Sequence, residues 1–348
     1  MTTTTDETAD ATIRRLQAVL HDRLAPCLPG HGSYALLDYP DHRNIGDHAI
    51  WLGELAYLRK HLRRPPSYVC SRRNLDPSAI RRLSATTPLF LNGGGNFGDI
   101  WPPHQHFRED VLAAFPDRVI IQLPQSIHFS SPEALTRAQR VISKHPGFAL
   151  FVRDEGSLSF ARSHFDCPVS LCPDMAFALG QQRRPRPPRR DVLMMLRRDK
   201  ESVDDGAGMD GMPASFGPAE DWVTFDEQRR GNKAPLRHRV EAKLLRSAPF
   251  ISEAHRRHRA YRDRSAWMVR RGLEQLAKAR CIVTDRLHVH ILSLILDIPH
   301  VCLDNNYGKV SRFRQCWTAS YRDSRQAASF AEATKQAMQL LETGQPAR

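Results

Sequence analysis

Short apolar runs alternate along most of this chain with longer segments whose apolar residues recur at helical spacing. The first half contains six such runs, at residues 34–37, 68–70, 89–91, 119–123, 149–152 and 169–172. Similar runs in the second half lie at residues 192–196, 281–283 and 298–303. Strands that alternate with helices predict an α/β protein whose parallel sheets are covered by helices on both sides.

The alternation is interrupted by a Pro/Arg-rich segment, residues 181–190, whose prolines predict a stiff, extended linker. We therefore predict an N-terminal domain at residues 13–180 and a C-terminal domain at residues 191–323, facing each other across a cleft. The polar, low-complexity residues 1–12 are expected to be disordered. Residues 324–348 are expected to contain a C-terminal helix, which is a candidate for crossing back onto the first domain.

The composition is typical of a soluble globular protein, with 41% hydrophobic and 26% charged residues among 348. The longest apolar run, residues 289–298, is too short to span a bilayer, and the N-terminal residues lack the pattern of a secretory signal. Seven cysteines without a CxxC pair argue against a zinc site or a disulfide framework. We therefore expect a cytoplasmic protein without a bound metal.

The net charge of +13 indicates an anionic partner. The basic residues concentrate in three stretches, residues 183–190, 229–246 and 256–271, none of which forms a stripe interleaved with aromatic side chains. The first stretch is the predicted linker, and the other two are expected to be solvated helix faces. Nucleic acid is therefore not expected, whereas a peripheral contact with an anionic membrane at its inner face stays open.

Polar and charged residues gather where the predicted strands end. In the second half these residues are Arg197, Asp285, Arg286, His288, Asp304 and Lys309. In the first half they are Asp38, Asn44, Asp47, Asn92, Gly93, Gly94, Gly95, Asn96, Gln125, Ser126, Arg153, Asp154 and Asp174. Ligands of open α/β sheets bind at the carboxyl ends of the strands. Because a core rich in Leu and Ile does not need Arg286, His288 and Lys309 for folding, we predict a site for an anion.

Two of these groups have structural alternatives. The Gly93-Gly94-Gly95 turn either lets a ligand approach backbone N–H groups or is simply a tight turn. Asn44 and its neighbours would cap a helix that starts near His48, where Asp47 would be stabilised by the helix dipole. Asp47 could also act as a general base toward a sugar hydroxyl.

The basic residues raise the same question. Arg153 either binds a carboxylate or phosphate through parallel hydrogen bonds or pairs with Asp154 or Asp174. His288 is predicted in the first turn of a helix capped by Thr284 or Asp285. There the helix dipole disfavours its imidazolium while a bound dianion favours it, so it can exchange a proton near neutral pH. His290 points to a different helix face and is assigned to the core.

The order of these motifs resembles that of the polysaccharide pyruvyl transferase family. The matching blocks are N-x-G-D at 44–47, N-G-G-G at 92–95, Q-S at 125–126, R-D at 153–154, P-D at 173–174, T-D-R-L-H at 284–288, and Lys309. They span residues 33–315, and the T-D-R-L-H block is the most specific. The resemblance implies a GT-B-like fold of two Rossmann-like domains with the active site in the cleft. It also implies transfer of a pyruvyl group from phosphoenolpyruvate to two hydroxyls of a sugar in an exopolysaccharide or its precursor, as a cyclic ketal.

The resemblance also implies roles for single residues. His288 is the main catalytic candidate, whereas Arg153 and Lys309 are expected to bind phosphoenolpyruvate. Further donor contacts are expected from Arg197, Arg286, Gly94 and Gly95. The acceptor, a glycan or lipid-linked saccharide, is expected to contact Asn44, Asn96, Gln125 and Ser126.

The reaction needs an acid near the donor's methylene carbon and a base near the hydroxyls. We assign the acid to His288 and the base to Asp47, and we expect no metal or other cofactor. One alternative is a GT-B nucleotide-sugar glycosyltransferase that places Arg197 and Lys309 on a diphosphate, although no E-x(7)-E-like pair follows Lys309. A non-catalytic protein that binds an anionic polymer or membrane is the third hypothesis.

Overall fold

The computed structural model describes residues 6–28, 32–197, 213, 216–222, 253–304 and 308–343. The chain divides into two compact units. Unit 1 comprises residues 1–17, 180–232 and 268–348, and unit 2 comprises residues 18–179 and 233–267. Both contain a parallel sheet, as the alternation of strands and helices predicted, whereas the predicted cleft between two domains stays a prediction.

Unit 2 contains a seven-stranded sheet, counted over the described residues. Its strands are β1 (Ala35–Leu37), β2 (Tyr68–Cys70), β3 (Leu89–Leu91), β4 (Gly94–Gly98), β5 (Ile120–His128), β6 (Phe148–Val152) and β7 (Val169–Leu171). The order is β2-β1-β3-β5-β6-β7, with β4 pairing with β5, and the pairs are parallel. The six predicted strands are therefore confirmed. The sequence prediction missed β4, because its G-G-N-F-G sequence has few of the side chains typical of strands.

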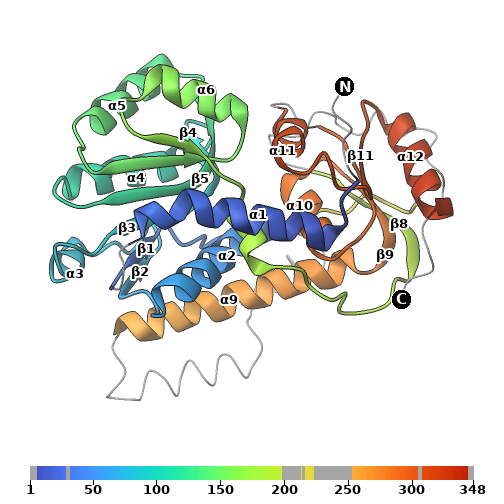
Figure 1. Ribbon diagram of the computed structural model, residues 1–348, viewed down its shortest axis with the longest axis horizontal. Helices are drawn as coiled ribbons and strands as arrows, with labels where there is room; N and C mark the ends of the chain where they lie inside the picture. Colours follow the sequence, from blue (N-terminus) through green and yellow to red (C-terminus); the bar gives the residue numbers. More distant parts are fainter. Residues whose placement is uncertain are drawn as a thin grey trace. The chain divides into compact units, whose positions relative to one another are not determined.

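Helices cover this sheet (Figure 1). They are α2 (Ile45–Leu62), α3 (Pro77–Arg81), α4 (Pro102–Ala114), α5 (Pro132–Ser143) and α6 (Glu155–His164), with 3₁₀ turns η1 (Ala25–Cys27) and η2 (Met175–Leu179). Side chains of Asp76, Ser131 and Asp154 accept hydrogen bonds from backbone amides at the starts of α3, α5 and α6. Such caps satisfy amides that have no partner within the helix.

The strands of unit 2 bury side chains on both faces. Leu37, Leu91 and Val152 belong to a core cluster that also contains apolar residues of α3, α4, α5 and α6. Leu36 and Phe90 point to the opposite face because neighbouring residues of a strand alternate, and they are fully buried as well. Burial on both faces is the reason why these strands read as continuous apolar runs.

Unit 1 contains a four-stranded parallel sheet among the described residues, in the order β11-β10-β9-β8. The strands are β8 (Arg190–Met195), β9 (Ala279–Thr284), β10 (His300–Cys302) and β11 (Ser324–Gln326). The helices are α10 (Leu287–Ile295), α11 (Lys309–Trp317) and α12 (Phe330–Thr343). The linker predicted at residues 181–190 carries no helix or strand before β8 begins at Arg190, and the Arg184 guanidinium donates to the Asp297 carbonyl of this unit at 3.0 Å.

The C-terminal segment contains the expected helix, which begins later than Ser324. The predicted helix begins only at Phe330, and residues Ser324–Gln326 instead form the edge strand β11. Helix α12 buries Ala333, Ala337 and Leu340 in the same cluster as Val192 of β8, so it packs on the sheet of unit 1. A crossing of this segment back onto the first domain stays a prediction. Its apolar stripe fits the nearest sheet face that lacks a cover.

The chain's N-terminal residues were also mispredicted. Disorder was expected up to residue 12, but helix α1 (Ala9–Leu24) already begins at Ala9, four residues before Ile13. Glu7 accepts hydrogen bonds from the Arg15 guanidinium at 2.9–3.3 Å, and this interaction lowers the pKa of Glu7 to about 2. Arg15 also donates to the Trp317 carbonyl at 2.9 Å, which ties this segment to unit 1.

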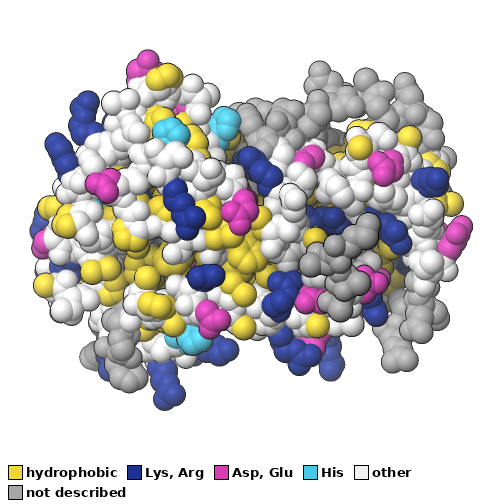
Figure 2. Space-filling model, turned by 45° about the horizontal axis from the view of Figure 1, so that its top comes forward, with side chains coloured by type: hydrophobic (Ala, Val, Ile, Leu, Met, Phe, Trp, Pro, Cys, Tyr) yellow, Lys and Arg dark blue, Asp and Glu magenta, His cyan; other side chains and the backbone are white. Residues whose placement is uncertain are grey.

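Helix α9 (Glu253–Leu276) is rich in arginine, and its first fifteen residues belong to unit 2. There the Tyr261 ring stacks on Tyr39 with centroids 3.8 Å apart. Figure 2 shows Lys and Arg side chains at several separate places on the face drawn, interspersed with Asp and Glu. The basic stretch at residues 229–246 and most of the loop at 202–217 lie outside the described residues. No described helix combines the length and the apolar composition that a membrane-spanning segment needs.

Candidate functional site

The carboxyl ends of three neighbouring strands in unit 1 carry basic residues. Arg197 follows β8, Arg286 follows β9, and Lys309 starts the helix after β10. Arg286 and Lys309 are each 8% exposed, and Arg197 is half-buried. Because the strands are parallel and adjacent, these residues belong to one edge of the sheet. We call Arg197, Arg286, His288 and Lys309 the cationic edge.

Hydrogen bonds between the ends of β8 and β9 fix the backbone of this edge. The Thr284 hydroxyl donates to the Met195 carbonyl at 2.7 Å and accepts from the Arg286 amide at 3.0 Å. The Arg197 amide donates to the Asp285 carboxylate at 2.9 Å. Burial raises the pKa of Asp285 to about 6, against the opposing effect of that hydrogen bond. The T-D-R motif therefore sets the positions of Arg197 and Arg286.

The Arg286 side chain forms an ion pair with Asp221, whose carboxylate oxygen lies 2.5 Å from the guanidinium nitrogen. Both side chains are largely buried, at 9% and 13% exposure. The expected cap of α10 was wrong, because Arg286 itself is the N-cap and no side chain caps the helix. Instead, the Thr284 hydroxyl is used by the backbone of β8 and of Arg286.

His288 lies in the first turn of α10, as predicted, and is half-buried. His290, two residues later, is fully buried, which confirms its assignment to the core. The two rings leave the helix in different directions because residues two apart do not share a face. The Asp304 carboxylate, just after β10, accepts from the Val310 amide at 3.2 Å and so fixes the start of α11, where Lys309 lies. Residues 305–307 of this motif lie outside the described part of the chain.

In unit 2, the carboxyl end of β1 carries an aspartate–histidine pair that sequence reasoning missed. Asp38 is 3% exposed, and both of its carboxylate oxygens lie within 3.0 Å of His104 Nδ1 in α4. Its φ of 66° is unusual for a residue other than glycine. Backbone strain of this kind is concentrated at functional sites. Asp38 was visible as a polar residue after a strand, but nothing local in the sequence linked it to a histidine 66 positions away.

The N-terminal end of α2 lies next to this pair. The predicted cap is confirmed, because the Asn44 side chain accepts from the Gly46 amide at 3.0 Å, and the helix begins at Ile45, three residues before His48. Asp47 lies in the first turn, with a carboxylate oxygen 3.5 Å from His42 Nε2. The His42 ring is edge-on to His104 with centroids 6.1 Å apart. Two carboxylates and two imidazoles therefore gather at this edge.

The N-G-G-G motif forms a tight connection between β3 and β4. Gly94 adopts a φ of 128°, and a side chain at Gly93 would place its Cβ 2.7 Å from the Pro124 carbonyl oxygen. The Gly93 amide donates to the carboxylate of Glu54, which is fully buried, at 2.7 Å. Burial raises the pKa of Glu54 well above its ordinary value. Packing alone therefore explains Gly93 and Gly94, and a ligand contact of Gly94 or Gly95 stays a prediction.

The residues expected to bind the acceptor take part in buried hydrogen bonds. Gln125 donates to Asn96 Oδ1 at 2.9 Å and accepts from the Asn96 amide at 3.1 Å. The Ser126 hydroxyl donates to Asp154 at 2.8 Å. Gln125 and Ser126 are buried, with at most 6% exposed. These bonds position the ends of β4, β5 and β6, and acceptor binding by these residues stays a prediction.

Arg153 was expected either to bind a ligand or to pair with an aspartate, and the structure shows a buried ion pair with Asp174. Its NH1 donates to Asp174 at 2.6 Å, and its Nε donates to the Ser126 hydroxyl at 2.9 Å. Arg153 is 3% exposed and Asp174 is fully buried. The structure therefore brings Arg197, Arg286, His288 and Lys309 to one edge in unit 1, while Arg153 belongs to unit 2. A shared site for all of them stays a prediction.

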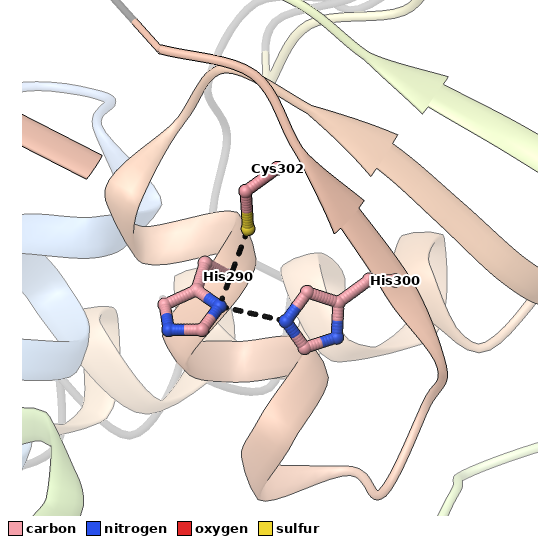
Figure 3. A group of neighbouring side chains, drawn as sticks. All are labelled: His290, His300 and Cys302. Carbon is pink, nitrogen blue, oxygen red and sulfur yellow. Dashed lines mark hydrogen bonds between the residues drawn. The ribbon is translucent and has the colours of Figure 1, made fainter. Parts of the chain in front are cut away.

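Among the described residues, metal-binding atoms converge in one group, which lies in unit 1 between α10 and β10. His290 on α10 faces His300 and Cys302 on β10 (Figure 3). All three side chains are fully buried. His290 lies on α10 and the other two on β10, the next strand, so their spacing in the sequence does not resemble a CxxC motif.

Comparison with known proteins identifies relatives of the chain. The sequence profile described as "Polysaccharide pyruvyl transferase" matches residues 44–307. A protein named "Pyruvyl transferase 1" from Schizosaccharomyces pombe is 34% identical over 295 residues, which cover 81% of this chain and 69% of that protein. The "Putative pyruvyl transferase EpsO" from Bacillus subtilis is 28% identical over 296 residues, which cover 84% of this chain and 88% of that protein.

A solved structure supports the fold. The crystal structure of a functionally uncharacterised protein from Klebsiella pneumoniae matches with a TM-score of 0.58 and 16% identity. The match covers 90% of this chain and 99% of that protein. At this identity the likeness concerns the fold alone. The profile match includes both the N-x-G-D and the T-D-R-L-H motifs.

Proposed function

Because this chain belongs to the polysaccharide pyruvyl transferase family, we propose that it transfers the pyruvyl group of phosphoenolpyruvate to two hydroxyls of one sugar. The product is a cyclic ketal on an exopolysaccharide or its precursor, and phosphate is released. Family membership makes the chain a transferase that acts on a glycan acceptor. The identity of the donor is supported by one observation above all, the convergence of basic side chains at the cationic edge of unit 1.

Phosphoenolpyruvate carries a carboxylate and a phosphate, so it needs several cationic hydrogen-bond donors. Arg286 and Lys309 are each 8% exposed, which places their charges in a partly dry environment. A charge-assisted hydrogen bond in such a place contributes about 1.5–3 kcal/mol. The N-terminal end of α10 adds the positive end of a helix dipole to the same edge. Arg197, Arg286 and Lys309 together therefore suit the polyanionic donor, and Arg153 in unit 2 remains a further candidate.

His288 is the proposed acid. It lies two residues after Arg286, so a donor anion bound at the cationic edge is within reach of its ring. A bound dianion stabilises the protonated imidazole, whereas the helix dipole destabilises it.

In unit 2, the carboxylates and imidazoles of Asp38, His42, Asp47 and His104 suit an uncharged acceptor. Asp38 orients His104 through Nδ1, which leaves Nε2 as the basic nitrogen of that ring. Asp47 lies 3.5 Å from His42 Nε2, while His42 Nδ1 accepts from the Asn44 backbone amide at 3.3 Å. A histidine held by a carboxylate, or the Asp47 carboxylate itself, can accept the proton of a sugar hydroxyl. We therefore retain Asp47 as a base candidate and add His104.

The proposed reaction balances without an oxidant or a cofactor. His288 protonates the methylene carbon of the donor, and the first sugar hydroxyl bonds to the adjacent carbon while losing its proton to the base. Phosphate then leaves with the electrons of its C–O bond, and the second hydroxyl bonds to the same carbon. One hydroxyl proton restores His288 and the other is taken up by phosphate. No metal takes part in this sequence.

The decisive experiment incubates the purified chain with phosphoenolpyruvate and a panel of glycan acceptors, and measures both phosphate release and product mass. A product heavier than the acceptor by one pyruvyl ketal, formed only when the acceptor is present, supports the proposal. Donor hydrolysis that does not depend on an acceptor would contradict it. A rise in melting temperature with a nucleotide sugar but not with phosphoenolpyruvate would favour a glycosyltransferase instead.

The same proposal places the enzyme in the cytoplasm, where its acceptor could be lipid-linked. The net charge of +13 supports a peripheral contact with an anionic membrane surface. Cosedimentation with anionic and with neutral vesicles at two salt concentrations tests that contact. Binding that is independent of salt and of lipid charge would contradict it.

A further inference from the structure

The buried histidine–cysteine cluster of unit 1 is not used by the proposed reaction. His300 and Cys302 are two residues apart on β10, so their side chains point to the same face of the strand. His290 reaches them from α10 (Figure 3). Three polar side chains in the middle of a core are unusual, because each must be satisfied by a partner.

The geometry of the cluster is close to that of a metal site. His290 Nδ1 lies 2.7 Å from His300 Nε2 and 3.5 Å from the Cys302 sulfur. The three ligand atoms all lie within 4.8 Å of one another. Around a tetrahedral zinc ion, such atoms would be separated by roughly 3.3–3.6 Å, given the usual zinc–nitrogen and zinc–sulfur distances. The distance between His290 Nδ1 and the Cys302 sulfur already fits this range, whereas the distance between the two nitrogens would have to widen by about 0.6 Å.

Both imidazoles are oriented by hydrogen bonds on their far sides. His300 Nδ1 donates to the Ile298 carbonyl at 2.8 Å, so His300 Nε2 presents a lone pair to the cluster. His290 Nε2 lies 2.8 Å from the Thr318 hydroxyl. Outer partners of this kind fix the tautomer and ring orientation of metal-binding histidines.

We infer that His290, His300 and Cys302 bind one zinc ion, which fixes α10 against β10 in unit 1. Two imidazole nitrogens and one thiolate suit zinc or copper(I) and do not suit magnesium or calcium. On binding, Cys302 releases its proton to solvent, and the His290 proton moves from Nδ1 to Nε2, where it is donated to Thr318. The inference departs from the sequence-based expectation of no metal, which rested on the lack of a CxxC pair and of a His/Asp spacing typical of metal ligands.

The ion would act on the structure and not on the reacting atoms. His290 is two residues after His288 on α10, and Cys302 is two residues before Asp304, which fixes the start of α11. Holding α10 and β10 together therefore positions His288 and Lys309 within unit 1. The inference is independent of the proposed donor and acceptor.

The test measures metal content by mass spectrometry in the full chain without an affinity tag, after expression in zinc-supplemented medium. We expect about one zinc per chain in the wild type, retained after gel filtration. The variant Cys302→Ala should lose it. Cys281→Ala is the matched control, because Cys281 is also fully buried, on the neighbouring strand β9, and belongs to no ligand group among the described residues. It should keep the zinc.

Anaerobic loading of the metal-free chain with copper(I) in competition with zinc decides which ion is preferred, and a preference for copper would overturn zinc as the occupant. If Cys302→Ala does not fold, cobalt(II) in the wild type provides the second readout, because a cobalt–thiolate bond gives a charge-transfer absorption in the near ultraviolet. Equal zinc content in the Cys302 and Cys281 variants, or no zinc and no cobalt–thiolate band in the wild type, would overturn the site.

Discussion

The carboxyl edges of the two sheets share one architecture but carry different side chains. In unit 1, the basic residues Arg197, Arg286 and Lys309 follow three adjacent strands. In unit 2, the corresponding edge is rich in carboxylates, and its arginine is held by Asp174 in a buried ion pair. Parallel strands bring residues of distant sequence to one edge in both cases.

The difference indicates what each edge can bind. An edge with basic side chains around the start of a helix suits an anion. An edge with carboxylates that orient imidazoles, as Asp38 orients His104, suits hydroxyl groups that must lose a proton. We therefore expect substitutions in unit 1 to change the use of the donor, and substitutions in unit 2 to change stability or the use of the acceptor.

The largest effect is expected from His288→Ala. Removal of a general acid should lower kcat by about 10²–10⁴-fold with little change in stability. The matched control is His164→Ala, because His164 on α6 stacks on Phe160 and lies at neither edge. Steady-state phosphate release measures both. An undiminished rate in His288→Ala would remove the proposed acid from the cationic edge.

Asp174→Asn tests whether Arg153 is held structurally. Loss of one partner of a buried ion pair leaves the other charge uncompensated, which costs about 3–5 kcal/mol of unfolding free energy. The control Arg137→Met breaks the pair with Glu109, in which Arg137 is 44% exposed, so its cost should be at most about 1 kcal/mol. Urea unfolding compares the two. If stability is unchanged in Asp174→Asn while donor affinity falls, Arg153 is primarily a ligand.

Asp285→Asn should alter the pH dependence of stability. The pKa of Asp285 is raised by burial from its ordinary value of 3.8 to about 6, so the folded state favours the protonated form. The contribution of Asp285 to the free energy of unfolding is therefore fully present below about pH 4 and is lost as the pH rises through about 6. The loss amounts to about 3 kcal/mol. The asparagine still accepts from the Arg197 amide and carries no charge.

The Asp285→Asn variant should therefore gain stability relative to the wild type as pH rises from 4 to 7. Unfolding free energies measured at several pH values provide the test. The control Asp191→Asn, at a site 59% exposed, should follow the wild type throughout. A constant difference between Asp285→Asn and the wild type would mean that Asp285 is not perturbed.

Lys309→Met should weaken donor binding selectively. Loss of one charge-assisted hydrogen bond should raise the dissociation constant for phosphoenolpyruvate by roughly 10- to 150-fold, which corresponds to about 1.5–3 kcal/mol. The exposed Lys144, at the end of α5, provides the control Lys144→Met. Isothermal titration measures both. Equal affinities in the two variants would exclude Lys309 from the donor site.

The smallest effect is expected from Asn44→Ala. Loss of the N-cap of α2 should cost about 1 kcal/mol of stability, the same as Ser131→Ala at the start of α5. If Asn44 also binds the acceptor, the KM of the Asn44→Ala variant for the glycan should rise, whereas the KM of Ser131→Ala should not. Identical behaviour of the two variants would leave Asn44 a cap alone.

The sequence by itself determined the order of the elements and the motifs. Nine apolar runs predicted nine strands, because strands buried on both faces leave a continuous apolar signal. Strand β4 escaped prediction because glycine gives no such signal, and β11 because Ser324 and its polar neighbours resembled the start of a helix. The T-D-R-L-H motif was readable because its residues are contiguous.

Only the tertiary structure decided which polar residues are partners. Arg153 joined Asp174, and Asp38 joined His104, through contacts that bridge 21 and 66 positions and have no local pattern. His290 was correctly assigned to the core from the helix period, but the convergence of its ring with His300 and Cys302 depends on how α10 packs on β10. Local spacing sets the direction of a side chain, whereas its partners are set by the packing of elements that lie far apart in the sequence.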